Sequence, residues 1–89
     1  MDAETLRAAL EETLAHCGIE IERRNLADDE HNIRSGLCEV EGRRVLILDK
    51  RLPPKTEAVI MADTLRDENL ETIYVSPAVR QYLGMEEEE

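Results

Sequence analysis

The apolar positions near the amino terminus follow helical spacing. Asp2 precedes this stretch and can cap a helix through its side chain, while Gly18 stands where a left-handed C-terminal cap is needed. The pattern therefore predicts a helix over residues 3 to about 17. Its inner face is predicted to consist of Leu6, Ala9, Leu10, Thr13, Leu14 and Cys17.

Three strands are expected after this helix. Residues 19–23 begin with apolar and charged positions in alternation, which is typical of a strand with one buried face. The polar cluster at 28–32 predicts a loop. A less strict alternation over residues 33–40 then meets Gly42, which can adopt the positive φ of a hairpin turn. Residues 43–49 are apolar on both faces, so we expect this strand at the centre of the sheet.

Two prolines separate the hairpin from an amphipathic helix. Pro53 and Pro54 cannot donate a sheet hydrogen bond, and Pro54 or Lys55 can open a helix. We expect that helix to end near Glu68. Its buried stripe is predicted to be Ala58, Met61, Ala62 and Leu65. Its outer face is predicted to be Glu57, Asp63, Thr64, Arg66 and Asp67.

The last part of the chain predicts a short strand and a short helix. Residues 72–75 are β-branched or aromatic, and Ser76 and Pro77 then form a helix-start signal. The full order is α-β-β-β-α-β-α, which we interpret as one α+β domain over residues 1–85. A small mixed sheet with a central hairpin would carry the helices, and the last strand would join it in parallel through a crossover.

The net charge of the chain disfavours some classes of binding partner. Eleven Lys and Arg face 21 Asp and Glu, and the net charge of −10 disfavours binding to nucleic acid or to an anionic membrane. Residues 86–89 are all Glu, and we expect a disordered acidic tail there. No apolar stretch is long enough to cross a bilayer, and Asp2 and Glu4 stand where a signal peptide would be basic. A cytoplasmic protein is therefore expected.

The segment 36–67, GLCEVEGRRVLILDKRLPPKTEAVIMADTLRD, resembles in outline the hairpin and active-site helix of minimal zinc peptidases of the ImmA and IrrE kind. In that family the helix carries HExxH, and the resemblance places Asp63, Thr64 and Asp67 at its three diagnostic positions. It therefore implies an inactive relative of such a core. The run 36–53 is also similar to a family of small bacterial proteins, which implies no function.

A metal-dependent hydrolase is the alternative hypothesis. Asp63 and Asp67 lie four residues apart and share a helix face, so together with His31 they offer ligands for a cation. A complete site needs more oxygen ligands than these. The other candidate zinc ligands, His16, Cys17 and Cys38, lack the spacing of known zinc motifs.

The preferred hypothesis is a non-catalytic interaction or assembly domain. The chain has no phosphate-binding glycine loop and no nucleophile elbow, and we predict no catalytic residue and no cofactor. An exposed sheet edge could bind a homodimer partner or another protein. The candidate contacts are Ile19 and Ile21 in the first strand, and Tyr82 with Met85 at the last helix.

Overall fold

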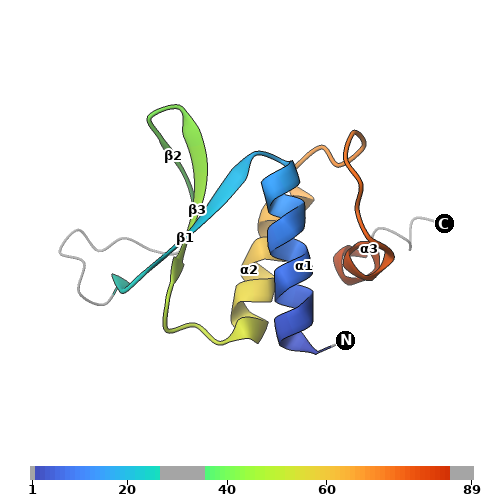
Figure 1. The fold of residues 1–89 in the computed structure, drawn as a ribbon, viewed down its shortest axis with the longest axis horizontal. Coiled ribbons are helices and arrows are strands. Elements are labelled where there is room, and N and C mark those ends of the chain that lie inside the picture. The colour runs from blue at the N-terminus through green and yellow to red at the C-terminus, as the bar shows by residue number, and fades with distance from the viewer. Residues whose placement is uncertain (1, 27–35, 85–89) are drawn as a thin grey trace.

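A computed structural model describes residues 2–26 and 36–84 of the 89-residue chain. The described part contains three helices and a mixed three-stranded sheet, which confirms the α+β class. Figure 1 shows the sheet on one side of α1 and α2, with α3 beyond them. The elements are α1 (Ala3–His16), β1 (Ile19–Arg24), β2 (Gly36–Val40), β3 (Arg43–Asp49), α2 (Pro54–Arg66) and α3 (Pro77–Leu83).

The strand at the centre of the sheet is β3, as its apolar sequence predicts. The strand order is β1-β3-β2, with β1 parallel and β2 antiparallel to β3. Ile21 of β1 and Leu37 of β2 both stand beside Leu46, on the face that meets the helices. Four consecutive side chains of β3 are at most 4% exposed, namely Val45, Leu46, Ile47 and Leu48.

Helix ends follow the local signals in the sequence. The Asp2 carboxylate accepts a hydrogen bond of 2.8 Å from the Thr5 backbone N–H, and Gly18 adopts φ 80° just after α1. Pro54 opens α2 as predicted, and the helix ends at Arg66, two residues before the expected position. The Ser76 hydroxyl accepts the Val79 backbone N–H at 3.4 Å and so caps α3.

The hydrophobic core lies between the helices and the inner face of the sheet. The predicted stripe of α2 is buried throughout, at Ala58, Met61, Ala62 and Leu65. One prediction for this helix is wrong, because Glu57 was expected on the outer face and its side chain is 3% exposed. It precedes Met61 by four positions, so helical spacing places it on the buried stripe.

The strand predicted at residues 72–75 does not form, so the last part of the order is α-α and not α-β-α. Both sides of β3 are already occupied, by β1 and β2, and this segment runs between α2 and α3 without joining the sheet. Val75 and Ile73 contact the core while Tyr74 is 72% exposed. The apolar residues of 72–75 therefore reflect packing against the helices and not membership of a strand. The parallel pair in this sheet is β1 with β3, and no crossover from a last strand contributes to it.

Several predictions fall outside the described residues. They are the loop at 28–32, the beginning of the second strand at 33–35, Met85, and the acidic tail at 86–89. Within residues 2–26 and 36–84, no helix has both the length and the apolar character that crossing a membrane requires.

Candidate interaction surface

The outer edge of β2 is unpaired in the described part of the chain. This strand hydrogen-bonds to β3 on one side, and Figure 1 shows the β2–β3 hairpin projecting beyond the helices. Leu37 is 44% exposed on the helix-facing side of the sheet, and Val40 is 41% exposed on the opposite side. Glu39 is the one charged residue of the strand. The edge therefore offers backbone donors and acceptors beside two half-exposed apolar side chains.

The β1 edge is also unpaired among the described residues, but charged side chains surround it. Glu20 pairs with Arg43 at 3.4 Å, and Glu22 pairs with Arg24 at 2.8 Å. Charges of this kind discourage pairing at a sheet edge. Of the two predicted contact residues here, Ile19 is 2% exposed and belongs to the core, and Ile21 packs against that core. Their side chains point inward, and their role at an interface stays a prediction.

The face of the sheet away from the helices has an apolar centre. Leu46 and Leu48 join the helix-facing core, so the intervening Val45 and Ile47 point to the opposite face. Each of these two residues is 4% exposed. Cys38 stands beside Val45 on this face, and its sulfur lies 3.9 Å from the carbonyl oxygen of Gly36.

A charge cluster missed in the sequence joins α1, β1 and the first turn of α2. Arg23 Nε donates to Glu57 Oε2 at 3.1 Å, and Arg23 Nη2 donates to Glu57 Oε1 at 3.0 Å. Arg7 Nη1 adds a bond of 3.4 Å to the same carboxylate, and Glu11 accepts from Arg23 at 3.2 Å. The bidentate bond to Glu57 raises the pKa of Arg23 above its usual range.

The function of this cluster is to fix three elements relative to one another. Both arginine side chains are 32% exposed, whereas the shared carboxylate is 3% exposed. Arg7 Nε is buried and finds no hydrogen-bond partner in the part of the chain that the structure describes. A sequence signal for the cluster exists, since Arg23 continues the inward positions of Ile19 and Ile21 and therefore requires an acidic partner.

Other ionisable groups pair locally at the surface. The Arg51 guanidinium and backbone N–H bind the Asp49 carboxylate and lower its pKa from 3.8 to about 2. Glu68 accepts a hydrogen bond from Arg44 and raises the pKa of that arginine. Burial raises the pKa of the Cys17 thiol, which favours its protonated, unreactive form.

The structure describes two of the three residues of the metal-site alternative. Asp63 is 68% exposed and pairs with Arg66 at 2.7 Å, while the Thr64 hydroxyl donates to the Ile60 carbonyl at 3.0 Å. Asp67 is the C-terminal cap of α2, and His31 lies outside the described residues. Within residues 2–26 and 36–84, no three His, Cys, Asp or Glu side chains gather as a metal site would require.

At α3, Tyr82 is half-buried and packs against the core, so part of its ring is occupied within the monomer. Met85, its predicted partner in an interface, lies outside the described residues. The role of Tyr82 and Met85 in an interface stays a prediction.

Comparisons with protein-family models, curated proteins and solved structures found no match. The resemblance of residues 36–67 to zinc peptidases therefore remains an interpretation of the sequence. Function has to be argued from the geometry of the surface.

Proposed function

We propose that this chain is a non-catalytic cytoplasmic assembly domain that binds a second copy of itself through β2. The observation that carries the proposal is the edge of β2, which is nearly uncharged and pairs with no strand of residues 2–26 and 36–84, with Leu37 and Val40 half-exposed beside it. The net charge of −10 disfavours nucleic acid as a partner. An edge with these properties favours strand addition.

A symmetric dimer requires that the strand complement itself. In an antiparallel pair centred on Cys38, Gly36 stands opposite Val40 and Leu37 stands opposite Glu39 of the second copy. This register pairs all five residues of β2 and brings no like charges together. A register centred on Glu39 would oppose two carboxylates, which is unfavourable. β2 is therefore self-complementary in the register centred on Cys38.

Pairing would extend each sheet from three strands to six. The free backbone groups of β2 would then be hydrogen-bonded, and Leu37 and Val40 would lose contact with water. A chain of this size buries only about two-thirds of the surface that its unfolded form exposes, so the burial in a shared sheet adds stability that the monomer lacks.

The non-catalytic part of the proposal is supported by the residues of α2 that the zinc-peptidase resemblance places at the HExxH positions. Asp63, Thr64 and Asp67 cannot supply the two imidazoles and the glutamate base of HExxH. We therefore include in the proposal that the chain is an inactive relative of such a core.

The first experiment measures molar mass against protein concentration, by light scattering or sedimentation. The wild type is expected to pass from monomer to dimer as concentration rises. Leu37→Glu should stay monomeric, because it would stand opposite Glu39 of the second copy, and like charges that face each other across a strand pair are destabilising. Val59→Glu is the matched control, since Val59 is 46% exposed on α2, and it should still dimerise. A wild type that is monomeric at every concentration would refute the proposal.

A second experiment tests the register. Facing residues of an antiparallel pair have Cα atoms about 4.5–5.5 Å apart, within the range that a disulfide spans. With copper phenanthroline as the oxidant, two Cys38 thiols should lose two electrons and two protons and form a covalent dimer. Cys17→Ser should still cross-link and Cys38→Ser should not. Failure of Cys17→Ser to cross-link would show that the register is wrong.

A further inference from the structure

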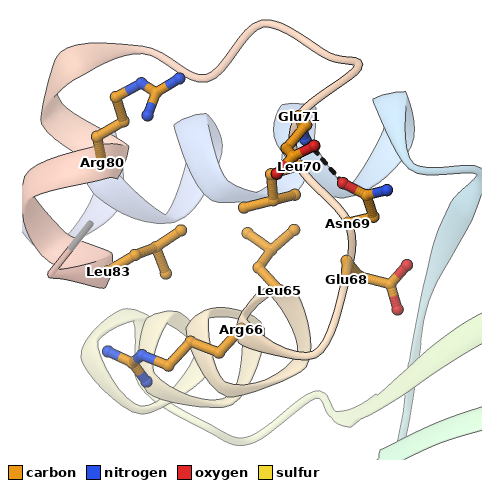
Figure 2. A pocket seen from close by; sticks show the side chains of 8 residues that line it. All are labelled: Leu65, Arg66, Glu68, Asn69, Leu70, Glu71, Arg80 and Leu83. Carbon is orange, nitrogen blue, oxygen red and sulfur yellow. Dashed lines mark hydrogen bonds between the residues drawn. The ribbon is translucent and has the colours of Figure 1, made fainter. Parts of the chain in front are cut away.

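A hollow lies between the end of α2, the segment that follows it, and α3 (Figure 2). Its volume is about 330 Å³, at the lower end for small-molecule sites. Three buried leucines form its floor, and Figure 2 shows their side chains converging. The lining residues are Leu65, Leu70 and Leu83 with Arg66, Glu68, Asn69, Glu71 and Arg80.

Two of the four charged groups around this hollow are already paired. Arg66 binds Asp63 at 2.7 Å, and Glu68 accepts from Arg44. Arg80 is the one arginine of residues 2–26 and 36–84 that has no carboxylate partner among those residues.

The second group without an ion-pair partner is the carboxylate of Glu71. The backbone N–H of Glu71 donates to Asn69 Oδ1 at 3.0 Å, while its side chain makes no ion pair with the described residues. Figure 2 shows Arg80 on α3 and Glu71 on the connecting segment, with the leucine floor between the two elements. The hollow thus combines one available cation, one available anion and an apolar floor.

We propose that this hollow binds a free aliphatic α-amino acid. The ligand carboxylate would meet the Arg80 guanidinium, its ammonium group would meet the Glu71 carboxylate, and its side chain would lie on the leucines. A zwitterion of this size satisfies both available charges at once, whereas an uncharged apolar ligand leaves both unpaired. This inference is independent of the pairing of β2.

The ligand class is tested with three probes of nearly equal shape. L-leucine carries both charges, 4-methylpentanoate lacks the ammonium group, and 3-methylbutylamine lacks the carboxylate. Because the hollow is open to water, we expect a dissociation constant for leucine on the order of 1 mM. Each singly charged probe should bind about tenfold more weakly. Titration followed by two-dimensional NMR resolves such affinities and locates the shifted residues.

Variants separate the site from general weak binding. Arg80→Gln and Glu71→Gln should each weaken leucine about tenfold, and Arg80→Lys should restore part of the affinity. Arg43→Gln is the control, because Arg43 is exposed on the sheet and pairs with Glu20. Thermal melting verifies that each variant is folded. Absence of leucine binding, equal binding of all three probes, or unchanged binding to Arg80→Gln would each overturn the proposal.

Discussion

At the scale of single residues, the buried carboxylate of Glu57 decides how three elements meet. It stands in the first turn of α2, where the helix dipole favours an anion, and it binds arginines of α1 and β1. Its 3% exposure makes these bonds less screened than those at the surface. Removing this carboxylate would therefore leave two partly buried arginines without their anion, which is destabilising.

Replacing Glu57 with Gln tests this expectation. The variant keeps the shape of the side chain but leaves Arg7 and Arg23 without their shared anion. Because both arginines are partly in water, we expect a loss of about 2 kcal/mol in the free energy of unfolding. Glu11→Gln removes the exposed member of the cluster and should cost less than about 0.5 kcal/mol. Urea denaturation measures both, and equal losses would contradict the assignment.

Asp49 gives an acid-dependent contribution whose sign follows from its pKa. The pKa is about 2 in the folded protein and 3.8 as an isolated group, so pairing with Arg51 stabilises the fold above pH 3.8. That stabilisation is lost as pH falls toward about 2. The wild type should therefore melt higher than Asp49→Asn at neutral pH, and the two melting temperatures should converge between these pH values. A constant difference down to pH 2 would count against the pairing.

Some residue-level features could be predicted because their causes are local. Asp2 caps α1 and Pro54 opens α2 through groups within one helical turn. Glu57 and Arg23 were not identified as a pair, because they are far apart in sequence and the pairing depends on how the elements pack. Arg80 and Glu71 were missed for a different reason, since their availability depends on which neighbours pair with other residues.

At the scale of elements, the β2–β3 hairpin depends on an unusual turn. Glu41 and Gly42 both have positive φ, at 53° and 81°, as in the type I′ turn that suits the twist of a hairpin. Glycine adopts this conformation readily, while glutamate adopts it at a cost. Substitution at Glu41 can therefore stabilise the turn, whereas substitution at Gly42 cannot.

Two substitutions at this turn should have opposite effects. Glu41→Asn should raise the free energy of unfolding by about 0.5–1 kcal/mol, because Asn tolerates positive φ. Gly42→Ala should lower it by about 1 kcal/mol through backbone strain. A Cβ at position 42 would meet no atom within 4 Å, so steric overlap does not contribute. Thermal and urea unfolding give both signs, and a destabilised Glu41→Asn would show that the turn is not of this type.

The element order could be predicted wherever the hydrophobic pattern of a segment was compatible with a single type of secondary structure. The apolar residues 45–48 indicated a central strand, and β3 is central. Residues 72–75 have an equally strong strand composition, yet the chain offers them no free position beside β3. The hydrophobic pattern of a segment indicates which of its side chains are buried. Whether the segment finds a strand to pair with depends on the arrangement of the whole sheet.

At the scale of the whole molecule, net charge opposes the proposed dimer. Two copies each carry −10, and their mutual repulsion is screened by salt over a distance of about 10 Å at 0.1 M. We therefore expect the dissociation constant of the dimer to decrease as NaCl is raised from about 0.02 to about 0.5 M. Sedimentation at each salt concentration measures it. Dissociation that increases with salt would contradict an apolar edge contact between two acidic copies.

The parallel pairing of β1 with β3 has a consequence for the order in which the chain folds during synthesis. Residues 19–24 find their partners at 44–49, and β2 adds to the other side of the same strand. A nascent chain that has emerged as far as Val40 therefore holds two strands without the one that joins them. Folding of the sheet must wait until β3 has left the ribosome, and chaperones can bind the exposed strands in that interval.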